Sequence, residues 1–161
     1  QSADHGGGGC NMSIDANQEN IKFEPLIVAF CCNWCSYAGA DLAGTSRLAY
    51  QANIKIIKVP CSCRVSPNFV LLAFQKGSDC FINAGGHPGD SQYSTGNYYT
   101  RRRLKVLMSL LEFFGVEQER LRLDWVSAAE GNKFANVMND FANTIRTLGK
   151  NVKLRDLRCN K

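Results

Sequence analysis

The chain has 161 residues, of which 45% are hydrophobic and 20% are charged, and its net charge is +5. This length and composition suit a single soluble globular domain that buries a core without disulfide bonds. The longest apolar run, residues 26–32, is far shorter than the ~20 residues of a membrane-spanning helix, and no nucleic-acid-binding motif accompanies the basic residues. We therefore expect neither a membrane nor a nucleic acid as a partner.

The predicted elements follow one another in a regular strand–helix order. Residues 1–22 are polar and glycine-rich, so we expect a flexible arm, and residues 150–161 form a basic tail. Between them, short apolar runs alternate with helical patterns, which is typical of a parallel sheet with helices on both faces. The sequence therefore predicts a single α/β domain over residues 23–149, with strand and helix repeated four times. Strands are expected at 25–30, 54–59, 80–85 and 120–126, and helices at 38–53, 66–77, 97–115 and 127–149.

Helix ends and core positions carry further signals. Ser66 is expected to cap the second helix, and Ser127 with Glu130 predicts a capping box at the start of the last helix. Trp125 and Phe134 are expected in the core. One apolar stripe at helical spacing predicts the buried face of the third helix: Leu104, Leu107, Leu111 and Phe114.

Five of the eight cysteines follow the first two predicted strands. Cys31, Cys32 and Cys35 come after the first strand, and Cys61 and Cys63 come after the second. The carboxyl ends of parallel strands meet at one edge of a sheet, where the functional crevice of such sheets lies. We therefore expect at least four thiols to lie close together there.

The residues alone leave three interpretations of this thiol group open. Four thiolates can bind zinc or an iron–sulfur cluster. The helices after the first two strands point their N–H groups at this edge, where they would stabilise an anionic [2Fe–2S] cluster. A structural zinc site normally folds a small module, which this domain does not need. The third interpretation is dithiol catalysis, because Cys32-Asn-Trp-Cys35 has the C-x-x-C form at a strand-to-helix turn.

The remaining conspicuous residues have less specific roles. Cys80 opens the third strand and is expected to be a small buried residue near the opposite edge, whereas Cys10 and Cys159 lie in the terminal segments. His87 is either a ligand or a turn residue bonded to backbone. Trp34 is expected to cap the edge, shield a cluster or contact a partner. The sequence lacks a signal-peptide pattern at its start, so its cysteines predict a reducing compartment, the cytoplasm.

Four stretches of the sequence carry a family resemblance. CNWCSYAGADLAG, VPCSCRV, HPGD…Y…GNYYTRRR and RLRLDWVSAAEGNKFA closely resemble the delta subunit of methyl-viologen-reducing hydrogenase, over about residues 25–149. Members of that family are small cytoplasmic electron-transfer subunits that carry one [2Fe–2S] cluster. They link a hydrogenase or formate dehydrogenase to the flavoprotein subunit of heterodisulfide reductase. Relatives also occur in other flavin-based electron-bifurcating complexes of anaerobes.

The chain departs from the family pattern at the proposed cluster. The family typically has further cysteines in the loop after the third strand, at the positions where this chain has Gly86 and Ser91. At the next position, family members commonly have His, whereas this chain has Gln92. The family also usually has Gly where this chain has Cys63. The resemblance therefore carries over three ligands residue by residue, but it does not carry over the fourth.

Our hypothesis is that Cys63 supplies the missing ligand. Cys31 and His87 are the reserve candidates. The predicted cofactor ligands are therefore Cys32, Cys35, Cys61 and Cys63.

The resemblance implies a non-catalytic electron-transfer subunit of an oxidoreductase complex. Its partners would be a hydrogenase- or formate dehydrogenase-type protein and a flavoprotein similar to that of heterodisulfide reductase. The arm and the basic tail are expected to help the chain dock. Three alternatives remain: a thiol–disulfide oxidoreductase using Cys32 and Cys35, a zinc-binding structural module, and a scaffold that has lost its cluster.

Overall fold

The computed structural model describes residues 23–93 and 95–151 of the chain. The expected arm over residues 1–22 and most of the expected tail, residues 152–161, lie outside the described residues, as do Cys10 and Cys159. Among the helices that the structure describes, none is long and apolar enough to cross a membrane.

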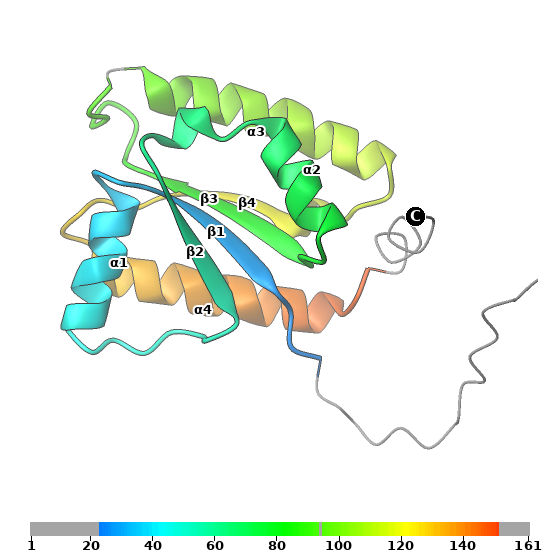
Figure 1. Cartoon of the computed structure of the whole chain (residues 1–161), viewed down its shortest axis with the longest axis horizontal. Helices are drawn as coiled ribbons and strands as arrows, with labels where there is room; N and C mark the ends of the chain where they lie inside the picture. Colours follow the sequence, from blue (N-terminus) through cyan, green and yellow to red (C-terminus); the bar gives the residue numbers. More distant parts are fainter. Residues whose placement is uncertain (1–22, 94, 152–161) are drawn as a thin grey trace, which may run out of the picture.

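The described residues form one parallel four-stranded sheet with the strand order β2-β1-β3-β4 (Figure 1). This confirms the predicted α/β fold. The second and third strands have the predicted bounds, whereas β1 ends two residues later than predicted because Cys31 and Cys32 still pair with Lys58 and Val59. The strands are β1 (Ile27–Cys32), β2 (Ile54–Val59), β3 (Cys80–Gly85) and β4 (Leu121–Trp125).

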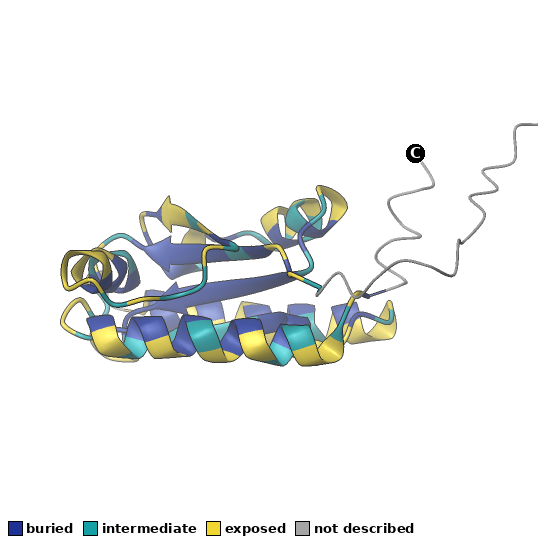
Figure 2. Cartoon of the chain, turned by 90° about the horizontal axis from the view of Figure 1, so that it is seen from below, coloured by how far each residue is buried: buried dark blue, intermediate teal, exposed yellow. Residues whose placement is uncertain are grey.

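Helices cover both faces of the sheet. The pair α1 and α4 packs on one face, and the pair α2 and α3 packs on the other (Figure 1). Figure 2 shows strands that are largely buried, whereas the helices alternate between buried and exposed residues. The helices are α1 (Ser36–Thr45), α2 (Pro67–Gln75), α3 (Gly96–Phe113) and α4 (Gly131–Leu148), and two short 3-10 helices are η1 (Ser62–Arg64) and η2 (Gln118–Arg120).

The strand order explains where a functional crevice forms. After β1, the chain crosses one face of the sheet as α1 and enters β2, which is the neighbour of β1 at one side of the sheet. After β3, it crosses the other face as α3 and enters β4 at the opposite side of the sheet. The space between the ends of β1 and β3 is therefore the topological switch point, where ligands bind in sheets of this kind. The loops that follow these two strands flank this point.

Alternate residues of β1 fill two separate core layers. Ile27, Ala29 and Cys31 belong to the layer under α1 and α4, whereas Phe30 belongs to the layer under α2 and α3. Phe81 on β3 is fully buried in the second layer. Burying such a side chain contributes about 2 to 3 kcal/mol to folding. These layers support the sheet whose carboxyl edge carries the thiols.

Two helices differ from their predicted bounds. The first ends at Thr45 and does not continue to residue 53, because Arg47 adopts a left-handed φ of 56°. The last begins at Gly131, since the preceding four residues form a turn in which the Glu130 N–H donates to the Ser127 carbonyl. Only one half of the predicted capping box forms: the Glu130 carboxylate accepts the Ser127 N–H at 2.8 Å.

The core predictions hold in part. Phe134 is fully buried, and Ser66 caps α2 by accepting the N–H of Asn68. Phe114 is 57% exposed, because α3 ends at the preceding residue and the chain turns away from the buried stripe. Trp125 is also wrongly predicted: it is half-buried, since it ends the edge strand β4, which has no neighbour on its outer side.

Candidate metal centre

The turn from β1 to α1 brings two thiols together. Cys32 is the last residue of β1 and Cys35 caps α1, and the Cys35 N–H donates to the Cys32 carbonyl at 3.3 Å. The Cys32 thiol donates to the Pro60 carbonyl at 3.8 Å, and it lies close enough to Cys35 to help raise the pKa of the Cys35 thiol. Ser36 fixes the turn, because its buried hydroxyl accepts the Cys32 N–H at 2.8 Å and donates to the Ala84 carbonyl on β3 at 2.6 Å. The first thiol pair is therefore anchored to the switch point.

The loop after β2 supplies a second thiol pair. The Cys63 thiol donates to the sulfur of Cys61 across 3.4 Å, and the two residues flank Ser62 in η1. Asn83 on β3 donates to the Ser62 carbonyl at 3.2 Å, and Arg103 on α3 donates to the Cys63 carbonyl at 2.8 Å. The second pair is thus tied to the central sheet and to α3.

The loop after β3 closes the third side, where glycines stand against the thiols. A Cβ atom added at Gly86 would lie 2.5 Å from the sulfur of Cys35. A Cβ atom added at Gly96 would lie 2.9 Å from the sulfur of Cys61, and the Ser91 hydroxyl oxygen lies 3.6 Å from that same position. Gly86 and Ser91 therefore lie beside the two thiol pairs.

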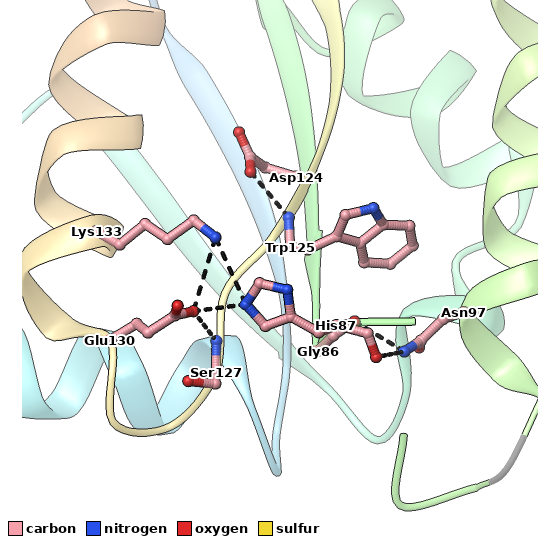
Figure 3. Close-up of polar contacts among 8 residues, drawn as sticks. All are labelled: Gly86, His87, Asn97, Asp124, Trp125, Ser127, Glu130 and Lys133. Atoms are coloured by element: carbon pink, nitrogen blue, oxygen red, sulfur yellow. Dashed lines mark hydrogen bonds and ion pairs between the residues drawn. The ribbon is translucent and has the colours of Figure 1, made fainter. Parts of the chain in front are cut away.

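Polar contacts hold this third loop in place (Figure 3). The buried amide of Asn97 on α3 donates to the carbonyls of both Gly86 and His87 at 2.7 Å. The ring of His87 contacts the Glu130 carboxylate at 2.8 Å, and that carboxylate also accepts the Ser127 N–H. The loop is therefore anchored to the start of α3 on one side and to the start of α4 on the other. His87 takes part in this anchor, which is a role that the sequence did not predict.

The environments of Cys35 and Cys63 favour the protonated thiol in the absence of a bound cation. Burial raises the pKa of Cys35 to about 11, and the neighbouring Cys32 adds to this increase. Burial and the adjacent thiol also raise the pKa of Cys63, while the nearby charges of Arg64 and Arg103 oppose the increase. A catalytic dithiol requires a lowered thiol pKa. The environments of Cys35 and Cys63 therefore differ from that of a thioredoxin-type nucleophile.

Two other cysteines lie apart from this group. Cys31 points into the core layer under α1 and α4, where it is fully buried, and burial raises its pKa to about 12. Cys80 is fully buried at the amino end of β3, as predicted, and burial raises its pKa as well. The structure therefore leaves Cys31 outside the group of thiols that face the switch point.

The donor set fits an iron–sulfur cluster, although the thiols are arranged in pairs. Within residues 23–93 and 95–151, no three His, Cys, Asp or Glu side chains are grouped so that they could hold a metal ion. A [2Fe–2S] cluster takes four cysteine thiolates, and the two pairs supply that number from adjacent loops. Because Gly86 and Gly96 have no side chains, their backbone can approach the sulfurs of Cys35 and Cys61 closely.

Sequence reasoning missed the residues that position the site. Ser36 and Asn97 are almost fully buried polar residues that bond to backbone atoms of the β1 and β3 ends. The available signal was their position, because each lies in the first turn of a helix that starts at the carboxyl edge of the sheet. Glu130 was identified only as part of a capping box.

The sequence is similar to a known family and to several characterised proteins. The sequence pattern of the family described as "Methyl-viologen-reducing hydrogenase, delta subunit" matches residues 27–149. The vhc iron-sulfur subunit of the F420-non-reducing hydrogenase of Methanococcus voltae is 48% identical over 128 residues, which cover 80% of this chain and 89% of the relative. The iron-sulfur subunit of the F420-non-reducing hydrogenase of Archaeoglobus profundus is 49% identical, with 80% and 93% covered.

A third relative is a much longer protein. It is one subunit, designated A, of the Ferredoxin/F(420)H(2)-dependent CoB-CoM heterodisulfide reductase of Methanosarcina acetivorans, and it is 44% identical over 125 residues. These residues cover 78% of this chain but only 16% of the relative. A segment similar to this chain is therefore part of the same polypeptide as that heterodisulfide reductase subunit.

Proposed function

This chain belongs to the family of methyl-viologen-reducing hydrogenase delta subunits, and we propose that it is an electron-transfer subunit carrying one [2Fe–2S] cluster. The observation that carries the proposal is the convergence of two thiol pairs from adjacent loops at the switch point. Two of the relatives described above are named iron-sulfur subunits. The proposed ligands are Cys32, Cys35, Cys61 and Cys63.

The residues of the chain would hold and shield the proposed cofactor. When bound, the cluster supplies one-electron transfer at a potential that hydrogen bonds and burial adjust. Ser36 orients the first thiol pair, and Asn97 holds the loop that covers it. Cys32, Cys35 and Cys61 are buried, whereas Cys63 is partly exposed. This difference makes the Cys63 side the shortest route between the site and solvent or a partner.

The partners follow from the relatives. On one side we propose a flavoprotein of the heterodisulfide reductase type, because a segment similar to this chain is part of a heterodisulfide reductase subunit in Methanosarcina acetivorans. On the other side we propose a hydrogenase or formate dehydrogenase that supplies electrons, since two relatives are hydrogenase subunits. The chain by itself would bind no substrate, nucleic acid or membrane, and it would work in the cytoplasm.

Analysis of the metal content tests this proposal. The full chain, purified without oxygen, should contain two irons and two sulfides per chain and give a rhombic EPR signal after reduction with dithionite. Cys32→Ser and Cys61→Ser should lose most of the iron. Cys80→Ala is the matched control, because this buried cysteine lies at the opposite end of the sheet, and it should keep the iron.

Three outcomes would contradict the proposal or a part of it. Zinc without sulfide, or a protein with no metal and a reversible Cys32–Cys35 disulfide, would exclude the cluster. A Cys63→Ser variant with unchanged iron content and an unchanged EPR signal would remove only Cys63 from the ligand set, and a Ser91→Cys variant would then test the family position.

A further inference from the structure

A groove of about 390 Å³ opens beside the partly exposed thiol of the candidate site. It lies between the loop after β2, the loop after β3 and the first turns of α3. We call it the arginine–tyrosine groove, after the side chains that form its rim. It is lined by Pro60, Cys61, Cys63, Arg64, Tyr93, Tyr99 and Arg103.

The groove is positively charged. Arg64 and Arg103 both line the groove. Both lie close enough to Cys63 for their positive charges to oppose the increase in the pKa of its thiol. Arg103 is held in position, because its Nη1 atom donates to the Cys63 carbonyl at 2.8 Å. No Asp or Glu is among the residues that line the groove. The nearby carboxylate of Asp90 lies close to Cys35, whose pKa it helps to raise, and it does not line the groove. An anionic group is therefore the complement that this groove requires.

The aromatic residues at the groove are unusually exposed. Tyr93 and Tyr99 are 51% and 58% exposed, and the adjoining Trp34 is 52% exposed. The indole N–H of Trp34 donates to the Tyr93 hydroxyl at 3.2 Å, so the two rings form one surface. Exposed Tyr, Trp and Arg side chains around a small cavity are the residues that dominate protein–protein binding energies.

We propose that the arginine–tyrosine groove docks a carboxylate-rich segment of the protein that exchanges electrons with the thiol site. This inference rests on the proposed function, because it explains how a partner approaches the cofactor. Cys61 and Cys63 form one wall of the groove, so a segment bound there lies directly against two of the proposed ligands. Opposite charges on the two partners also speed their encounter and orient them.

The test uses a simple acidic probe and a matched pair of double variants. Hexaglutamate and hexaglutamine peptides are titrated into the full chain by calorimetry at low and at physiological salt. Hexaglutamate should bind, hexaglutamine should not, and binding should weaken as salt increases. Arg64→Gln with Arg103→Gln should weaken hexaglutamate binding at least tenfold. Arg101→Gln with Arg102→Gln removes the same charge from exposed positions of α3 outside the groove, and it should weaken binding less than threefold.

Several results would overturn the proposal. Equal losses in the two double variants would show that binding depends only on net charge. Tighter binding of inorganic phosphate than of hexaglutamate would show a small-anion site. Because Arg103 also bonds to the Cys63 carbonyl, Arg64→Gln alone is measured as well, and it should weaken binding at least threefold without changing the unfolding midpoint.

The docking test is independent of the cluster. If metal analysis excludes the cluster but Arg64 and Arg103 still select hexaglutamate, the proposed function fails and the groove remains a docking site. If the cluster is present but the double variants lose binding equally, only the docking inference fails. In the intact complex, the variant that lacks both groove arginines should also slow electron transfer to the flavoprotein partner and make it less sensitive to salt.

Discussion

The two edges of the sheet use the same residue types for different purposes. At the amino edge, Arg120 is fully buried and donates to the Glu117 carboxylate at 2.6 Å and to the Gly149 carbonyl at 2.7 Å. Cys80 is also fully buried there. At the carboxyl edge, Arg103 and Cys63 keep contact with solvent. The edge of the sheet at which a residue lies, more than the type of the residue, decides whether it serves the fold or the site.

The amino edge is closed by a network of hydrogen bonds. Arg120 also donates to the Asp79 carbonyl at 3.3 Å, the Asp79 carboxylate accepts the Leu26 N–H at 2.9 Å, and Asn151 contacts the Glu117 carboxylate. This network joins the segments that precede β1, β3 and β4 to the end of α4. Among the described residues, the thiol edge has no comparable ion pair with a fully buried arginine, so we expect its residues to tolerate substitution better.

The largest expected effect therefore comes from the amino edge. Arg120→Met removes a buried charge, one of the donors to the Glu117 carboxylate and the Arg120 donors to two carbonyl groups. This should lower the free energy of unfolding by about 3 kcal/mol. Urea unfolding of Arg120→Met and of the control Arg103→Gln, which should lose less than about 1 kcal/mol, measures the difference. Similar losses in both variants would contradict the distinction between the two edges.

A smaller effect is expected from a methyl group at the thiol edge. Gly86→Ala places its Cβ 2.5 Å from the Cys35 sulfur, so it should cost about 1 to 3 kcal/mol and reduce the iron bound per chain. Gly44→Ala, on α1, is the control, because nothing lies within 4 Å of its Cβ; it should stabilise the protein by about 0.5 to 1 kcal/mol. Unfolding and iron analysis are measured together. Unchanged iron in Gly86→Ala would show that the loop yields to the added atom.

The smallest expected effect is a change in the pH dependence of stability below pH 4.5. The hydrogen bond from the Ser127 N–H makes the largest contribution to lowering the pKa of Glu130 from 4.5 to about 2, and the hydrogen bond with His87 makes the next largest. A lowered carboxyl pKa stabilises the folded state fully above pH 4.5, and this contribution disappears as the pH falls toward 2. The difference in unfolding midpoint between the natural chain and Glu130→Gln should therefore shrink over this range.

The amino edge offers the corresponding comparison. Burial would raise the pKa of Glu117, but hydrogen bonds from Arg120, from its own backbone and from Asn151 lower it below 4.5. Glu117→Gln should thus show the same direction of pH dependence. If the difference in unfolding midpoint between the natural chain and either variant stays constant with pH, the ionised carboxylate at that position does not stabilise the folded state through these partners.

The sequence predicted the fold because its apolar runs have a length and spacing that only a covered parallel sheet can bury. Residues 54–59 and 80–85 were predicted to the residue, since turn or helix-ending residues border each run. The same order placed four cysteines at one edge, and the structure brings them together in two pairs. The end of α1 was missed because Arg47 adopts a left-handed conformation that no glycine marks.

The tertiary structure alone decided which residues hold the thiols in place. Ser36 and Asn97 are ordinary polar residues in the sequence, and only the approach of β1, β3 and α3 gives their side chains backbone partners. It also separated Cys31 from Cys32, because neighbouring residues of a strand point to opposite faces. Residue type and periodicity are local properties, so the sequence determined the sheet and the edge where chemistry belongs. Burial and distance depend on the whole packed chain, and these placed Gly86 against Cys35 and left Cys63 beside two arginines.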